Sequence, residues 1–427
     1  MPPLLAPGPI NPVQFVSLLN ATGTMFIRFR TALLIAGFLF GFYVPSSLGG
    51  VISRDLTIVA LLGTCAVLGL LVVLPSGFTP PLGVAAGLGM LAVLIVASVV
   101  SPFDEFSPGV IFIYVAIALL YMLDLRGTVS RRGVIAAFAV MNVLSVALGA
   151  AIVLGVEPVH AVLKTYYSAF YPDLVPNMLD KFAISKPVLT FGTHSMAGFV
   201  VYVIGYLSLL AFERDGRWLG LTAAVAHLVM LALLTSTTST ILGLVLAAQI
   251  AWSILRDRPA LTWFVPVFVV LIVGSAVLIA GVTLAGSLAS ARQAVLGDRI
   301  AGFLSRYAQN GLLTTDLRYL SVHPFRPIGF SFSNSLNLGD SGLMINLLRG
   351  SIPGMLITYG GLYAFLRQNI GDLFTARWLW VVTIAFEAGF PPLQYFRFVA
   401  ALPLLVAYAH VMTSAAPASP VPVGMAR

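Results

Sequence analysis

The sequence predicts an all-α fold, a polytopic bundle of transmembrane helices that also carries a helical loop domain on one side of the membrane. Hydrophobic residues make up 59% of the 427 residues and charged residues only 9%, whereas a soluble domain has ~25% charged residues. The apolar residues form long blocks, such as 56–74 and 82–100, and ~20 residues cross a bilayer as a helix. The blocks lack the alternation of a membrane β-barrel, so we expect helices, which satisfy their own backbone groups in lipid.

About twelve blocks are long enough to be membrane spans. They cover residues 31–46, 56–74, 82–100, 108–123, 133–155, 193–212, 218–234, 239–255, 262–286, 343–366, 378–389 and 397–412. The predicted organisation is an N-terminal tail (1–30), nine spans (31–286) with an outer loop at 156–192, a long loop (287–342), three spans (343–412) and a C-terminal tail (413–427). Both tails are Pro-rich, and the first has no basic start of a cleaved signal peptide.

The positive-inside rule orients this topology. With the N-terminus inside, the cytoplasmic basic residues are Arg28, Arg30, Arg126, Arg131, Arg132, Arg214, Arg217, Arg256, Arg258, Arg367, Arg377 and Arg427. Only Arg54 and Arg397 fall in or beside short outer loops, while eight others lie in the two long loops and Arg349 lies within a span. We therefore predict a multi-pass membrane protein with both tails in the cytoplasm and residues 287–342 on the periplasmic face.

Composition excludes several other functions. The net charge of +8 is divided between two membrane faces without a basic run, so we expect no nucleic-acid partner. The single cysteine, Cys65, allows no intramolecular disulfide. A GxxxxGK[ST] phosphate loop is absent, which argues against an ATP-driven pump. No D-x-D pair or His/Cys cluster of ligand spacing occurs, so we expect no metal and no cofactor.

Arginines in the second long loop form a possible anion-binding row. Arg292, Arg299 and Arg306 recur every seven residues, which places them on one face of a helix with ~20° of drift per heptad. Guanidinium groups hold phosphate through paired, charge-assisted hydrogen bonds, so a lipid pyrophosphate is a natural ligand. An amphipathic helix that lies on the membrane with a solvated basic face fits the same spacing.

Arg349 is a charge inside a predicted span, after the largely apolar stretch LMINLL. A charge at that depth is costly unless it is paired or hydrated. Anion binding in a water-filled cavity is the favoured interpretation, and snorkelling to the outer headgroups is the alternative. Arg397 is a further candidate for substrate binding, although a structural ion pair with Glu387 across the turn around FPPLQYF is the favoured role for these two residues.

Three outer groups are candidate general bases, in the order Asp340, His323 and His194. A sugar hydroxyl that attacks an anomeric carbon must lose its proton to a carboxylate or imidazole within hydrogen-bond reach. Capping of a helix by Asp340 is the alternative role for that residue. Tyr166 and Tyr167 could stack on sugar rings, although an interfacial aromatic belt is the commoner explanation for such residues.

The order of motifs resembles the O-antigen polymerase and ligase superfamily. The resemblance rests on GDRIAGFLSRY, HPFRPIGFSF and DSGLMINLLRGSIPGMLITYGGLYAFL, preceded by TFGTHSMAGFVVYVIGYL and LLTSTTSTILGLVL, over roughly residues 187–366. It implies glycosyl transfer on the outer leaflet from a polyprenyl-pyrophosphate-linked saccharide, with no nucleotide sugar and no metal. Ligases of the family carry a histidine where this chain has Asp340-Ser341-Gly342, and a basic residue where it reads STTST, so a polymerase is favoured.

The resemblance therefore implies a Wzy-like exopolysaccharide polymerase of the bacterial inner (cytoplasmic) membrane, with its active site facing the periplasm. Its expected partners are an undecaprenyl-pyrophosphate-linked repeat unit and the growing polysaccharide chain, with flippase and chain-length or export proteins as further candidates. A ligase is the alternative within the family. A secondary transporter is the alternative from another class, but such transporters carry inverted repeats, and the sequence shows no such symmetry.

Overall fold

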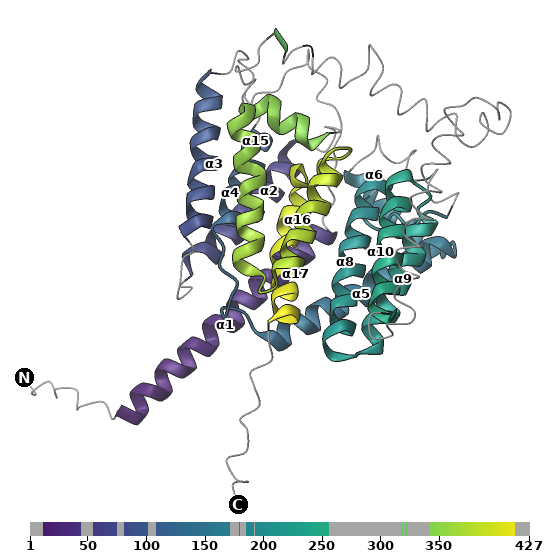
Figure 1. Ribbon diagram of the computed structural model, residues 1–427, viewed down its shortest axis with the longest axis horizontal. Coiled ribbons are helices and arrows are strands. Elements are labelled where there is room, and N and C mark those ends of the chain that lie inside the picture. Colours follow the sequence, from purple (N-terminus) through teal and green to yellow (C-terminus); the bar gives the residue numbers. More distant parts are fainter. Residues whose placement is uncertain are drawn as a thin grey trace, which may run out of the picture.

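The computed structural model describes residues 12–43, 54–74, 81–100, 108–170, 179, 185–191, 193–255, 318, 321–322 and 341–414. Within these residues all regular structure is helical. The helices are α1 (Pro12–Tyr43), α2 (Arg54–Val73), α3 (Pro81–Val100), α4 (Pro108–Tyr121), α5 (Arg131–Val153), α6 (Glu157–Phe170), α8 (His194–Asp215), α9 (Trp218–Leu233), α10 (Thr237–Leu255), α15 (Gly342–Asn369), α16 (Leu373–Glu387), the short 3₁₀ helix η2 (Pro392–Gln394) and α17 (Phe396–Thr413). Figure 1 shows most of them upright in a bundle, from which α1 slants away toward the N-terminus.

Each predicted span that falls in the described part of the chain coincides with a helix, while 262–286 lies outside it. Two details differ from the prediction. α1 begins at Pro12 rather than at residue 31, because Arg28 and Arg30 do not interrupt a helix as proline or glycine would. The predicted outer loop 156–192 contains α6, which follows a tight turn at Gly155, where φ is +65°.

Five helices are long and apolar enough to cross a membrane, namely α3, α5, α8, α10 and α17. α8 and α17 are central, since 89% of the apolar stretch of each is buried, whereas α3 is peripheral, with 22% of its apolar stretch buried. α3 exposes Leu88, Ile95 and Val99. Exposed aliphatic side chains along a whole helix suit contact with lipid, so the chain has the character of a membrane helix bundle.

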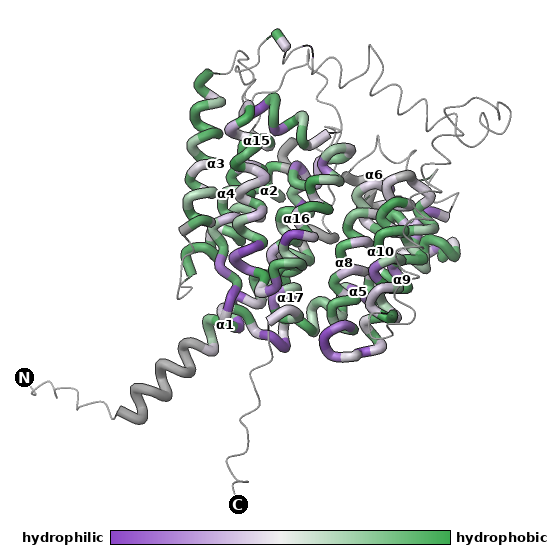
Figure 2. The backbone as a smooth tube through the Cα atoms, viewed as in Figure 1, coloured by the Kyte–Doolittle hydropathy of each residue, from purple (hydrophilic) through white to green (hydrophobic). Residues whose placement is uncertain are grey.

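The bundle has two polar ends with an apolar middle (Figure 2). We call the end with the turns 122–130, 216–217 and 370–372 the lower end, and the end with the start of α15 and the turn 388–395 the upper end (Figure 1). Arg126, Arg214 and Arg367 lie beside the lower turns. Many of the basic residues in the described part of the chain thus lie toward the lower end.

Glycines allow two groups of helices to pack closely. On α15, a Cβ at Gly361 would collide with the ring of Tyr121 on α4. On α8, a Cβ at Gly198 would collide with Oγ of Ser239 on α10. α17 contacts both groups, through α4 and α15 on one side and α5 and α8 on the other.

α15 is broken in its middle. Ser351 has φ 60° and ψ −167°, a conformation outside the helical region, and Pro353 follows in the next turn. Such a conformation is almost confined to glycine and costs of order 1–3 kcal/mol in other residues. The break divides α15 into an upper segment that carries Asn346 and Arg349 and a lower segment that carries Tyr359.

Candidate functional site

Three arginines are buried in the described part of the bundle, and their hydrogen bonds distinguish them. Arg30 is 2% exposed, Arg397 is 1% exposed and Arg349 is 9% exposed. A buried guanidinium is costly unless its donors find acceptors. The way in which each arginine meets this requirement therefore shows whether it ties the fold together or remains available to a ligand.

Arg30 and Arg397 use both terminal nitrogens on the protein. Nη1 of Arg30 donates to the carbonyl of Leu74 (2.6 Å) and Nη2 donates to that of Asp124 (2.8 Å). Nη1 and Nη2 of Arg397 donate to the carbonyl and to Oγ1 of Thr190, at 2.5 and 2.6 Å. The Arg397 guanidinium also lies over the ring of Phe191, 4.4 Å from its centroid. Both arginines act as structural ties between segments that are distant in sequence.

Arg349 uses only one nitrogen in this way. Its Nη1 donates to Oε1 of Gln394 at 2.8 Å, and its guanidinium lies 5.7 Å from the ring centroid of Tyr114. Its Nε is buried without a hydrogen-bond partner in the described part of the chain. A guanidinium binds an oxyanion through two parallel hydrogen bonds, and Nε is one of the donors that can take part in such a pair.

A buried hydrogen-bond network surrounds Arg349 at the upper end. Oη of Tyr114 donates to Oδ1 of Asn346 at 2.6 Å, and Nδ2 of Asn346 donates to Oη of Tyr359 at 2.9 Å. Oη of Tyr359 then donates to Oε2 of Glu387 at 2.8 Å. Nε2 of Gln394 donates to Oη of Tyr114 at 3.0 Å and to Oδ1 of Asn346 at 3.2 Å. The network joins α4, α15, α16 and η2.

The predicted ion pair between Glu387 and Arg397 is wrong. Glu387 is fully buried and accepts from Tyr359 and from the backbone amide of Leu393 (2.8 Å). Within the described residues no salt bridge involves it. The turn 388–395 reverses the chain so that Glu387 faces α15, whereas Arg397 faces the segment 185–191.

The start of α15 is built over the Glu387 carboxylate. The N-cap is Ser341 rather than Asp340, and its Oγ accepts from the amide of Met344 and lies 3.4 Å from the carbonyl of Glu387. A Cβ at Gly342 would overlap Oε2 of Glu387, so only glycine fits while this carboxylate stays in place. Close approach to Glu387 and helix capping thus account for the last two residues of the DSG motif.

The remaining predicted site residues are distributed as follows. Asp340, His323, Arg292, Arg299 and Arg306 lie outside the described residues. His194 is the first residue of α8 and is half-buried. Tyr166 and Tyr167 lie on α6, and only the backbone is described there. The structure therefore brings none of these residues to Arg349 among the contacts that it describes.

Four network members were not predicted from the sequence: Tyr114, Asn346, Tyr359 and Gln394. Each is a neutral polar residue in or beside an apolar span. Asn346 carried the strongest signal, because an amide in the middle of LMINLL requires a partner in lipid or in the protein interior. The two tyrosines carried a weaker one, since aromatic residues are common at the ends of spans.

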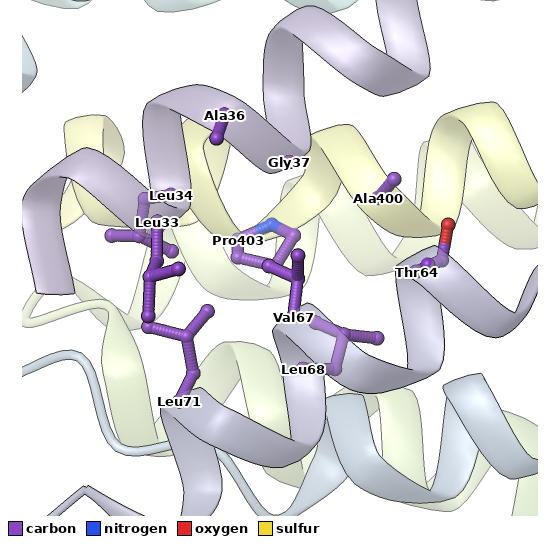
Figure 3. A pocket seen from close by; sticks show the side chains of 11 residues that line it. Leu33, Leu34, Ala36, Gly37, Thr64, Val67, Leu68, Leu71, Ala400 and Pro403 are labelled. Atoms are coloured by element: carbon purple, nitrogen blue, oxygen red, sulfur yellow. The ribbon is translucent and has the colours of Figure 1, made fainter. Parts of the chain in front are cut away.

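A cavity in another part of the described bundle is apolar (Figure 3). It has a volume of about 200 Å³ between α1, α2 and α17. Leu34, Gly37, Leu68 and Pro403 contribute to its walls, and none of the residues around it is charged. The cavity has no charged group that could bind an anion or polarise a bond, which leaves the network around Arg349 as the candidate site.

The described residues contain no group of three or more His, Cys, Asp or Glu side chains that could hold a metal ion. The chemistry available at the candidate site is that of one cation, one buried carboxylate, two hydroxyls and two amides. Such a set can bind and orient an anion. No protein-family model, curated protein or solved structure matches this chain.

Proposed function

We propose that this protein is a glycosyltransferase of a bacterial inner membrane that polymerises lipid-linked repeat units into exopolysaccharide on the periplasmic face. In this proposal the upper end of the bundle faces the periplasm, and the chain crosses the membrane about twelve times. The donor is an oligosaccharide on polyprenyl pyrophosphate, and neither a metal nor a nucleotide sugar takes part. The motif resemblance over residues 187–366 supplies the reaction class.

One observation carries the proposal: Arg349 is a buried cation whose Nε has no hydrogen-bond partner among the described residues. A pyrophosphate leaving group develops negative charge as the bond to the anomeric carbon breaks. A guanidinium held beside it in a site shielded from water stabilises that charge, because the group is oriented before the reaction begins. The Gln394 hydrogen bond and the Tyr114 ring supply that orientation.

The separation of charges supports the orientation. Arg126, Arg214 and Arg367 lie beside turns at the lower end, as expected for the cytoplasmic side of a membrane protein. Arg349 lies in the upper segment of α15, above the break at Ser351. A polyprenyl tail would remain in the outer leaflet while its pyrophosphate reaches this depth.

The proposed reaction is a single inverting displacement. One outer group takes the proton of the acceptor hydroxyl, the acceptor oxygen attacks the anomeric carbon, and the polyprenyl pyrophosphate leaves toward Arg349. Asp340 is the first candidate for the base, because it is two residues before the start of α15. His323 and His194 follow in that order, and the row Arg292, Arg299 and Arg306 would supplement the anion site.

Substitution of Arg349 tests the proposal. Purified protein in liposomes is given a polyprenyl-pyrophosphate repeat unit without ions or a gradient, and polymer length is measured. Arg349→Ala should lower the elongation rate ~100-fold, as removal of one donor to developing charge does, and Arg349→Lys should be nearly as poor because lysine lacks the planar fork. The matched control is Arg377→Ala, an exposed arginine on α16. A folded Arg349→Ala enzyme with normal elongation would refute the role of Arg349.

The base is tested separately. Asp340→Asn keeps the size and polarity of the side chain, and asparagine also caps helices well, but an amide cannot accept the proton. Base catalysis therefore predicts a loss of ~100-fold or more. Normal chains from a stable Asn variant would transfer the assignment to His323.

A secondary transporter is the second candidate, because broken helices such as α15 line the substrate sites of many transporters. The same liposome experiment separates the two functions. A polymerase lengthens the repeat unit in the absence of any gradient, whereas a transporter moves it unchanged.

A further inference from the structure

The network between Arg349 and Glu387 runs in one direction. Arg349 donates to Oε1 of Gln394, and Nε2 of Gln394 donates to Tyr114. Tyr114 donates to Oδ1 of Asn346, and Nδ2 of Asn346 donates to Tyr359. Tyr359 donates to Glu387, and every link therefore has its donor on the Arg349 side and its acceptor on the Glu387 side. We call this series the relay.

Glu387 determines that direction. Oε2 of Glu387 accepts from Oη of Tyr359, so the single proton of Tyr359 is used there, and Tyr359 accepts from Nδ2 of Asn346. Asn346 must then turn Oδ1 toward Tyr114. The same logic continues along the relay until Gln394 presents its carbonyl oxygen, rather than its NH₂ group, to Arg349. The amide of Leu393 occupies the other carboxylate oxygen, which fixes Glu387 in the same turn that carries Gln394.

We infer that Glu387 is a positioning residue for an anion site at Arg349, because the relay turns the carbonyl of Gln394 toward Nη1, while Nε has no partner among the described residues and is the donor that phosphate or pyrophosphate would use. The inference rests on the part of the proposed function in which Arg349 binds an anion. A direct Glu387–Arg349 ion pair would occupy the guanidinium with a carboxylate. Four neutral side chains instead lie between Arg349 and Glu387, and they keep the guanidinium in one orientation.

Replacement of Glu387 by glutamine should reverse the relay. The introduced side chain would keep its oxygen on the Leu393 amide and offer its NH₂ group to Tyr359. Tyr359 would then donate to Asn346, which would turn its NH₂ group toward Tyr114, and Gln394 would finally present NH₂ to Arg349. Two donors would face each other, and Arg349 would lose the contact that orients it. The variant changes one functional group and leaves the volume of the side chain nearly unchanged.

The test measures the affinity of the full-length protein in nanodiscs for inorganic pyrophosphate by calorimetry, which requires no glycosyl transfer. Glu387→Gln should weaken binding about tenfold, the size of a strong coupling between linked residues. Tyr359→Phe, which removes one link, should have a similar effect. The matched control is Tyr121→Phe, because Tyr121 is also buried between α4 and α15 and donates to the carbonyl of Thr358 (2.5 Å) but is not part of the relay.

A double-mutant cycle separates the relay from general loss of structure. In a Gln394→Met background, which has no amide to turn, Glu387→Gln should change the affinity by less than about twofold. Gln394→Glu should lower pyrophosphate affinity, because a carboxylate would pair directly with Arg349 and could no longer donate to Tyr114 and Asn346.

The outcomes are distinct. Wild-type affinity in a folded Glu387→Gln variant, or equal effects of this substitution in both backgrounds, would overturn the relay even if the protein elongates polysaccharide. Absence of pyrophosphate binding in the wild type would overturn the anion site and the relay together. Relay-dependent binding in a protein that does not elongate chains would support the inference and refute the polymerase.

Discussion

Arg30 near the lower end and Arg349 at the upper end are held differently. Both terminal nitrogens of Arg30 are used by main-chain carbonyls just beyond α2 and α4, and Arg214 at the same end donates to the carbonyl of Val411. Arg349 donates through Nη1 to a side chain, that of Gln394, and Nε of each of these two buried arginines has no partner in the described part of the chain. Carbonyls at helix ends need donors, so the lower arginines complete the fold. Arg349 is held on one side by Gln394, and this arrangement suits a group that binds a ligand.

Arg30→Ala should lower stability and leave activity near normal, the reverse of what we expect for Arg349→Ala. Arg30→Ala leaves the carbonyls of Leu74 and Asp124 without their donor, and the loss should be about 3 kcal/mol of stability, since bonds to charged groups contribute ~1.5–3 kcal/mol each. Elongation per folded molecule should stay near normal. Thermal unfolding and chain length measured together check this, with the exposed Arg28→Ala as control. A stable but inactive Arg30→Ala variant would contradict the structural role of Arg30.

A single methyl group should disturb the upper end. Gly342→Ala places a Cβ where Oε2 of Glu387 lies, so the carboxylate must move, and the expected destabilisation is about 2 kcal/mol. Pyrophosphate affinity should fall as well. Gly360→Ala is the control on the same helix, because a methyl group there would meet nothing within 4 Å, and alanine favours a helix by ~1 kcal/mol over glycine. Equal stability of the two variants would contradict the close packing of Glu387.

The strained residue at the break in α15 gives a further test of the upper end. Ser351 adopts φ 60° and ψ −167°, so Ser351→Gly should relieve strain and raise the stability by about 1 kcal/mol. Chain elongation should be unchanged, because glycine retains the break that separates Arg349 from the lower segment of α15. Ser351→Ala should show no such gain. An increase in thermal midpoint for the alanine variant that matches the glycine variant would contradict the strain.

The smallest effect is expected at a lower turn. Asp372 caps α16 and accepts from the Thr375 amide at 2.6 Å. Burial opposes ionisation of this carboxyl, but the hydrogen bonds from Thr375 and Phe374 outweigh it and lower its pKa below the ordinary value of 3.8. A lowered folded-state pKa stabilises the fold above the unfolded value, and this stabilisation is lost as pH falls through the folded pKa. Asp372→Ala should therefore cost about 1 kcal/mol at neutral pH.

Unfolding measured as a function of pH checks this prediction. The difference between wild type and Asp372→Ala should be constant near neutrality and should shrink below about pH 4. Elongation by the variant should remain normal, because the cap lies at the opposite end of the bundle from Arg349. A difference that grows as the solution is acidified would contradict the lowered pKa.

Part of the candidate site was predictable. Arg349 stood out because a charge in an apolar block is rare and must have a partner. Glu387 also stood out, but its predicted partner was wrong, because sequence proximity suggested Arg397. The actual partner, Tyr359, is 28 residues away along the chain. Tyr114 is 232 residues from Asn346, and no spacing rule reaches so far.

The sequence by itself determined where the helices lie, because long apolar blocks in lipid can satisfy their backbone only as helices. It also determined which charge lies within a span. Only the tertiary structure decided which arginines use both terminal nitrogens on the protein, since that depends on the helix ends and side chains that surround each guanidinium. Arg30 and Arg397 meet carbonyls from distant segments, whereas Arg349 meets one amide side chain. Hydrogen-bond direction is a property of the assembled network, and no single residue in the relay encodes it.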